Sequence, residues 1–177
     1  MKTGPVIRIA TVNDAAEVSR LLRSAMLTYC ADSGISSTML EAMTESIESV
    51  ADRIIRQTCL VAESDGKIVG SICLKRVENP IIYNFSDKTL SFLEKAGPSY
   101  YISRFAVIQS YRKTGLGIDL ITKALDMARE DGTKCVLLHS AATNKNMVEF
   151  YGKRGFELID SENSRGYKRG LFANTSF

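Results

Sequence analysis

The chain has 177 residues, 45% of them hydrophobic, and its 23 basic and 20 acidic side chains give a formal net charge of +3. This length predicts one domain over residues 1–177, with a core that needs neither disulfides nor metals. The composition excludes disordered, collagen-like and coiled-coil classes for the whole chain. The scattered basic residues favour neither nucleic acid nor an anionic membrane as a partner.

The cysteines and the single histidine do not form a metal-binding pattern. Cys30, Cys59, Cys73 and Cys135 lie far apart without a C-x-x-C pair, and His139 has no cysteine or histidine at ligand spacing. We therefore expect no metal, and we expect the cysteines in apolar runs to be free and buried. Reduced thiols, together with the absence of a signal-like or membrane-spanning run, predict a soluble, cytoplasmic protein.

The first third of the chain predicts a strand followed by two helices. Residues 6–12 are rich in β-branched side chains and predict a strand. Asp14 and Glu17 have the spacing of a capping box and begin a helical apolar pattern that Gly34 interrupts. A second capping box and apolar stripe predict one continuous helix over residues 38–57.

A hairpin and an interruption follow. Residues 59–63 and 67–77 are β-rich runs on either side of Asp65-Gly66, a dipeptide that supplies the positive φ of a tight turn. Residues 78–98 then interrupt the succession of strand-like runs: they contain prolines, glycine, an aromatic cluster and a predicted short helix over residues 86–95. We interpret this segment as an insertion between two strands.

The remaining elements predict the fold class. Residues 100–108 predict a strand, 118–130 an amphipathic helix and 134–140 a buried strand, a unit that implies two parallel strands with a right-handed crossover. A short helix over 144–154 and a final hairpin complete the chain. The expected fold is α/β, with a mixed, mostly antiparallel central sheet flanked by helices.

A glycine-rich loop connects that strand to the helix, with the sequence Arg112-Lys113-Thr114-Gly115-Leu116-Gly117. Glycines let main-chain N–H groups approach a ligand closely, and the first turn of a helix adds unpaired donors and partial positive charge. The two basic residues add full charges, so the loop suits a diphosphate. A tight turn whose glycines serve only the backbone is the simpler alternative.

Two other phosphate-binding motifs do not match. A Walker loop needs Gly-Lys-Ser/Thr ahead of the helix, whereas Gly117 is followed by Ile118. A dinucleotide fingerprint needs a third glycine where the chain has Leu120, and an acidic residue where it has Leu137 and Leu138. These mismatches leave a nicotinamide-dependent dehydrogenase as a distant interpretation.

The run from Val107 to Gly117, followed by Asn144, by Tyr151 seven residues later and by Gly155-Phe156, resembles the GNAT superfamily of N-acetyltransferases. The resemblance covers essentially the whole chain except residues 78–98. It implies acetyl-CoA as the cosubstrate and direct transfer of the acetyl group to a primary amine within a ternary complex. The acceptor would be a small-molecule or peptide amine, and an exposed edge strand would allow a homodimer.

The resemblance also implies roles for particular residues. The main chain of Phe105, Ala106 and Val107 would bind the pantetheine arm, with the Val107 N–H as oxyanion donor. The loop from Arg112 to Gly117 would hold the pyrophosphate. Asn144 matches a pantetheine-binding position, although it can equally be a helix N-cap, and both roles can hold together.

Tyr151 would be the general acid. It follows Asn144 by about two helical turns, which places the two residues on one helix face. A neutral phenol can give its proton to the departing thiolate of CoA. The alternative is a tyrosine that only packs in the core.

The general base is less defined, because residues 100–107 contain no carboxylate where many relatives keep a glutamate. His139 is the nearest titratable candidate. Water relayed to main-chain carbonyls, Glu41 and Glu45 stay open as alternatives. A non-catalytic acyl-CoA sensor with the same fold is therefore the rival function. The aromatic cluster in residues 78–98 would either form a lid over the acceptor or fill space beneath a loop.

Overall fold

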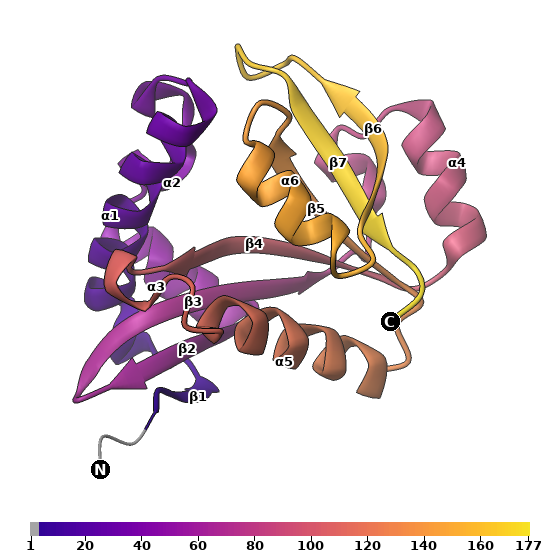
Figure 1. Ribbon diagram of the computed structural model, residues 1–177. Coiled ribbons are helices and arrows are strands. Elements are labelled where there is room, and N and C mark those ends of the chain that lie inside the picture. The colour runs from indigo at the N-terminus through magenta and orange to yellow at the C-terminus, as the bar shows by residue number, and fades with distance from the viewer. Residues whose placement is uncertain (1–3) are drawn as a thin grey trace.

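The computed structural model describes residues 4–177 as one seven-stranded sheet with helices on both faces (Figure 1). The strand order is β1-β2-β3-β4-β5-β7-β6, and only β4 and β5 run parallel. The strands are β1 (Val6–Ile9), β2 (Thr58–Ser64), β3 (Lys67–Arg76), β4 (Ser99–Val107), β5 (Cys135–Ala141), β6 (Glu157–Glu162) and β7 (Arg169–Asn174). The mixed, mostly antiparallel α/β fold expected from the sequence is confirmed.

The α-helices are α1 (Ala15–Ser33), α2 (Glu41–Thr44), α3 (Ile47–Arg56), α4 (Asp87–Ala96), α5 (Leu116–Glu130) and α6 (Lys145–Gly152). Short 3-10 turns precede several of them, namely η1 (Val12–Asp14), η2 (Ser37–Met39), η3 (Pro80–Tyr83) and η4 (Gln109–Tyr111). Helices α5 and α6 pack on one face of the sheet, whereas α1 and α3 cover the β1–β3 part of the other face. On that second face, α4 packs over β5 and β7.

Two details of the amino-terminal helices differ from the prediction. The capping box is formed by Thr11 and Asp14, and the Glu17 carboxylate instead accepts a hydrogen bond from the Ile68 main-chain N–H at 3.0 Å. The predicted helix over residues 38–57 is broken into η2, α2 and α3. Glu45 leaves the helical conformation with ψ of 126°, and the Ser46 side chain caps a new helix. The break lets the Glu45 carboxylate turn into the protein.

The β2–β3 hairpin and the helix between β3 and β4 agree with the sequence. Asp65 and Gly66 both have positive φ, at 50° and 71°, as a tight two-residue turn requires. Ser86 caps α4 through its hydroxyl, which accepts a hydrogen bond from the Thr89 N–H. The interpretation of residues 78–98 as an insertion stays a prediction.

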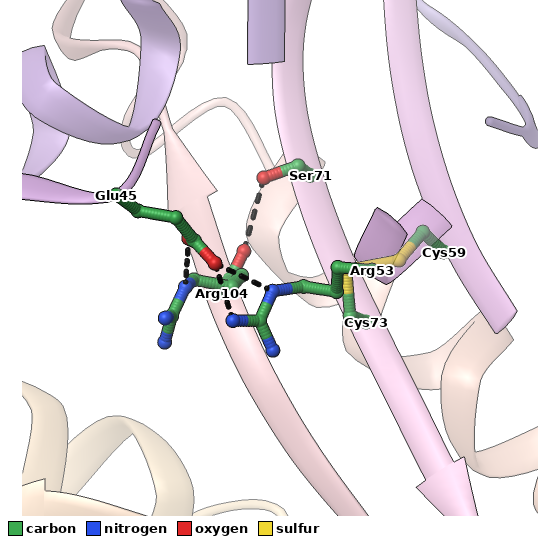
Figure 2. The surroundings of a disulfide bond; sticks show 6 residues. All are labelled: Glu45, Arg53, Cys59, Ser71, Cys73 and Arg104. Carbon is green, nitrogen blue, oxygen red and sulfur yellow. Dashed lines mark hydrogen bonds and ion pairs between the residues drawn. A yellow bond between two sulfur atoms is a disulfide. The ribbon is translucent and has the colours of Figure 1, made fainter. Parts of the chain in front are cut away.

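The expectation that Cys59 and Cys73 are free thiols is wrong, because they form a disulfide across the β2–β3 hairpin (Figure 2). They are register partners on neighbouring strands, with Cα atoms 4.1 Å apart. Cys135 is free and buried, as expected, and Cys30 is also free and buried. The argument from reduced thiols therefore no longer supports a cytoplasmic location, which stays a prediction.

Residues 4–177 include no helix that combines the length and the apolar character needed to cross a bilayer. Over the same range, His, Cys, Asp and Glu side chains do not gather in threes as a metal ion would require.

The disulfide can be tested by counting thiols. In denaturant without reductant, iodoacetamide should label Cys30 and Cys135, and after reduction it should label all four cysteines in peptide mass spectra. Because the bridge closes a short loop, Cys59→Ala with Cys73→Ala should lower the free energy of unfolding by about 3 kcal/mol. Reductant should destabilise the wild type by a similar amount and leave the double variant unchanged. Four labelled thiols without reductant would contradict the pairing.

Candidate active site

A cavity of about 880 Å³ opens where β4 and β5 part. The parallel pairing covers only four residue pairs and ends at Ile102 and Leu138, although β4 continues to Val107 and β5 to Ala141. Figure 1 shows the β5–β7–β6 part of the sheet turning away from the β1–β4 part. The separation leaves main-chain groups of both strands without a partner strand, and the cavity lies between them.

A β-bulge shapes β4 at this point. Ser71 of β3 pairs with Ala106 and Cys73 pairs with Ser103, so β4 contains one extra residue between these pairs. Arg104 in the bulge has φ of +53°, and its carbonyl accepts a hydrogen bond from the Ser71 hydroxyl at 3.0 Å (Figure 2). A non-glycine residue in this conformation is strained. The bulge turns the Arg104 side chain into the cavity lining.

The ladder beyond the bulge determines which N–H groups face the gap. The Ile108 N–H donates to the Val69 carbonyl at 2.9 Å. Because successive residues of a strand point their N–H groups to opposite sides, the Val107 N–H points away from β3 and into the gap. By the same alternation the main-chain groups of Ala106 point toward Ser71 of β3, so they belong to the β3–β4 pairing and do not face the gap. Of the predicted pantetheine-binding stretch, Val107 therefore has an N–H that faces the gap.

The glycine loop has a run of free main-chain donors, and three of its residues, Lys113, Gly115 and Gly117, line the same cavity. Within residues 4–177, the main-chain N–H groups of residues 113–117 donate no hydrogen bond. Lys113 and Gly115 have positive φ, at 63° and 98°, and α5 begins at the next residue, Leu116. Five consecutive donors at a helix N-terminus form an anion-binding nest. This geometry goes beyond what a tight turn alone would need.

Basic side chains surround the loop. Arg112, Lys113, Lys153 and Arg154 line this end of the cavity. The Nε of Arg112 also donates to the Val107 carbonyl at 3.1 Å, which ties the loop to the end of β4. A Cβ added at Gly117 would come within 3.4 Å of the Phe105 ring, so a larger side chain there would extend into the cavity.

Asn144 is the N-cap of α6. Its side-chain oxygen, Oδ1, accepts a hydrogen bond from the Met147 N–H at 3.1 Å, and its side-chain Nδ2 donates to the Ser33 hydroxyl at 3.0 Å. The side chain is buried, yet it lines the cavity. The capping role is therefore confirmed, and contact with a pantetheine arm stays a prediction.

Tyr151 lies on α6 in an aromatic environment and lines the cavity. Its ring contacts the rings of Phe105, Phe150, Phe156 and Phe172. Burial raises the pKa of its phenol well above the ordinary value, and the neighbouring Tyr29 and Tyr101 raise it further. The phenol therefore keeps its proton at neutral pH.

His139 forms a pair with Tyr101, a residue that the sequence did not single out. The Tyr101 hydroxyl lies 2.7 Å from His139 Nδ1, and both residues line the cavity. Burial lowers the pKa of His139 to about 3 and raises the pKa of Tyr101 to about 12, so both side chains are neutral at physiological pH. Tyr101 is the register partner of Leu137, and His139 lies two residues further along β5, so no local sequence signal identifies the pair.

The aromatic cluster of residues 78–98 packs against this pair. The Tyr83 ring stacks on Phe85 and contacts the Tyr101 ring, with centroids 5.2 and 5.5 Å apart. The Phe85 ring lies 6.3 Å from the His139 ring. Neither Tyr83 nor Phe85 lines the cavity. These contacts favour the packing interpretation over a lid.

The two glutamates considered as bases differ in their surroundings. Glu45 is buried and accepts hydrogen bonds from Arg53 Nε at 3.1 Å and from Arg104 Nε at 2.8 Å (Figure 2). Burial alone would raise the pKa of Glu45, but the hydrogen bonds from both arginines outweigh it and lower the pKa. Glu41 lines the cavity and is paired with Arg165. Its pKa is also lowered, because nearby guanidinium groups outweigh the effect of burial.

With the geometry established, comparison with known proteins gives the class. The sequence profile described as Acetyltransferase (GNAT) family matches residues 34–156, and the chain belongs to this family. The fold is similar to the PaiA N-acetyltransferase of Thermoplasma acidophilum, a structure in complex with coenzyme A. The TM-score is 0.76 at 19% identity, with 98% of this chain and 99% of that chain covered.

Two curated relatives are more similar in sequence. N-alpha-acetyltransferase 50 of Danio rerio is 33% identical over 70 residues, which are 39% of this chain and 41% of the relative. The chain thus spans less than half of that relative's length. S-alkylcysteine N-acetyltransferase of Bacillus subtilis (strain 168) is 25% identical over 167 residues, 91% of this chain and 83% of the relative.

The buried carboxylate of Glu45 should support stability at neutral pH. Glu45→Gln leaves Arg53 and Arg104 without a counter-charge and should lower the free energy of unfolding at pH 7 by about 2 kcal/mol. Because the folded pKa lies below the ordinary 4.5, the stabilisation is present above pH 4.5 and is lost as the pH falls through the folded value.

Urea denaturation at pH 7 and pH 3 measures this effect. The difference between Glu45→Gln and the wild type should shrink at the lower pH. Asp52→Asn, which removes an exposed pair with Arg56, is the matched control and should change stability by less than about 0.5 kcal/mol. An equal loss at both pH values would contradict the role of the charge.

Proposed function

We propose that this protein transfers an acetyl group from acetyl-CoA to a primary amine by direct attack. The observation that carries the proposal is the run of five free N–H groups at residues 113–117, which opens into a cavity that also reaches the Tyr101–His139 pair. A diphosphate at the loop would direct the rest of the cofactor along the gap between β4 and β5. The family membership and the N-acetyltransferase names of the relatives support the same reaction.

Two residues have the geometry to act on the thioester. The Val107 N–H faces the gap, so it can donate a hydrogen bond to the oxyanion of the tetrahedral intermediate. Tyr151 keeps its proton until a thiolate forms, because burial raises its pKa. It can then protonate the departing sulfur, which prevents the thiolate from attacking the product.

The proton of the attacking amine needs a route out of the site. Glu45 is ion-paired with two arginines and does not line the cavity, so it is not our candidate for the general base. His139 is neutral, and its Nδ1 is hydrogen-bonded to Tyr101. With a pKa of about 3, His139 would pass a proton on to water instead of retaining it. We therefore propose that the Tyr101–His139 pair and water together accept the proton.

A non-catalytic acyl-CoA sensor is the second candidate. The observation in its favour is that both candidate glutamates are ion-paired, which leaves the cavity without a strong base. Thiol release from acetyl-CoA across a panel of amines separates the two functions. Tight CoA binding without turnover of any amine would favour the sensor.

Replacing Tyr151 tests the general acid. Tyr151→Phe keeps the ring packing and removes only the hydroxyl, so kcat should fall by about 100-fold while acetyl-CoA affinity stays within about threefold. Thiol release and isothermal calorimetry measure the two quantities. Tyr111→Phe is the matched control, because the Tyr111 hydroxyl bonds Ser64 away from the cavity. Unchanged kcat in Tyr151→Phe would remove this residue as the acid.

Replacing Gly117 tests the cofactor loop. Gly117→Leu places a branched side chain in the cavity beside Phe105 and should abolish CoA binding in calorimetry. Gly152→Leu is the control, since a Cβ at that helical glycine meets nothing within 4 Å. Circular dichroism should show that both variants are folded. Undiminished CoA affinity in a folded Gly117→Leu variant would refute the assignment of the loop.

A further inference from the structure

Three arginines from distant parts of the chain line the end of the cavity opposite the glycine loop. Arg104 comes from the bulge of β4, Arg165 from the turn between β6 and β7, and Arg169 from the start of β7. Their side chains are 15%, 37% and 18% exposed, so two of them are largely withdrawn from bulk solvent. Withdrawing a guanidinium group from water costs desolvation energy, and a purely structural role in a cavity wall does not require a charged side chain.

The three guanidinium groups act on the same small region. All three lower the pKa of Glu41, and all three oppose the rise in the pKa of Tyr101 that burial causes. Arg165 and Arg169 add to the effect of burial in lowering the pKa of His139. Glu41 is ion-paired with Arg165 and lies 3.9 Å from Arg104. The positive charges therefore surround the point where the amine of an acceptor would approach the Tyr101–His139 pair.

Arg165 and Arg169 are each paired with one carboxylate, and Arg104 with two, since its Nη2 also lies 3.9 Å from Glu41. Arg104 donates through Nε to Glu45 at 2.8 Å, and Arg169 donates through Nε to Glu162 at 2.6 Å. In the part of the chain that the structure describes, the terminal Nη atoms of these two arginines donate no hydrogen bond. Figure 2 shows the end of the Arg104 guanidinium group pointing away from Arg53 and Ser71. Anchored guanidinium groups with free Nη donors are suited to bind a carboxylate.

The acidic residues at this end of the cavity are Asp32 and Glu41. Glu41 is 63% exposed and already occupies a position between two of the arginines. Its carboxylate marks where a carboxylate of an acceptor can be bound, and its exposure lets it move aside. A polyamine would bring further positive charge to three arginines, and the amino terminus of a protein lacks a nearby carboxylate.

We propose that the acceptor is a small amino acid derivative with a free carboxylate close to its amine. Arg165 and Arg169 bind the carboxylate, with Arg104 beside them, and this directs the amine toward Tyr101 and His139. The inference rests on the acetyl transfer proposed above. The amine nitrogen bonds to the thioester carbon and the C–S bond breaks. The ammonium group loses two protons: one passes to water, and the other replaces the proton that Tyr151 gives to the departing sulfur. The products are an N-acetylamino acid and CoA.

The test compares acceptors that differ only in the carboxylate. Thiol release from acetyl-CoA is measured for the twenty standard amino acids, for their carboxamides and decarboxylated amines, and for spermidine and an unblocked peptide. For the preferred amino acid, kcat/KM should exceed that of its carboxamide at least about tenfold. Equal or better turnover of carboxamides, decarboxylated amines, spermidine or the peptide would overturn the inference and leave the transferase intact. No thiol release with any amine would overturn the proposed function itself.

An arginine variant separates recognition from folding. Arg165→Gln should raise KM for the amino acid about tenfold and leave kcat/KM for its carboxamide unchanged, and Arg165→Lys should restore part of the loss. Arg76→Gln removes an exposed ion pair with Asp131 outside the cavity and should change neither substrate. If Arg165→Gln lowers kcat/KM for the acid and the carboxamide equally, the carboxylate is not what Arg165 binds.

Discussion

The separation of β4 from β5 is the constraint on which the rest of this structure depends. Each N–H buried without a partner costs about 1–3 kcal/mol, so strands that part must find other acceptors for their main chains. On the β5 side, the Ala141 N–H donates to the Tyr29 hydroxyl of α1 at 2.6 Å. On the β4 side, the Val107 N–H has no partner strand and faces the cavity. Helix α1 therefore provides a hydrogen-bond partner on the β5 side of the gap, whereas the β4 side keeps an N–H available for a ligand.

Electrostatics divides the cavity into two ends of different character. At one end, main-chain donors of the glycine loop and several lysine and arginine side chains suit the phosphates of a cofactor. At the other end, three guanidinium groups are held in place by Glu45, Glu41 and Glu162. Between the two lie neutral groups, Tyr151 and the Tyr101–His139 pair, which burial keeps uncharged. Arg104, in the bulge of β4, has two roles: its side chain lines the cavity, and it forms the buried ion pair with Glu45.

Local sequence patterns predicted the glycine-loop end of the cavity better than the end lined by the three arginines. The glycine loop and the Asn144 cap are formed by neighbours in the chain, and their conformations follow from glycine and capping preferences. The arginine-lined end combines α2, β4, β5 and the β6–β7 turn, so no short motif contains it. The break at Glu45 also escaped prediction, because the apolar stripe continues through it and the ion pairs of Glu45 with Arg53 and the distant Arg104 form only in the folded protein.

The sequence by itself determined the order of elements, the tight turn at Asp65-Gly66, the parallel β4–β5 unit and the glycine loop ahead of α5, because these depend on contacts within a few residues or on periodicity. The tertiary structure decided the pairings that depend on register. Counting outward from the turn pairs Ser64 with Lys67 and would place Cys59 opposite Ile72. A bulge between Ala62 and Glu63 shifts the register by one residue, so Cys59 faces Cys73 instead. Such a shift moves side chains between faces of a sheet, and packing against the whole core selects it.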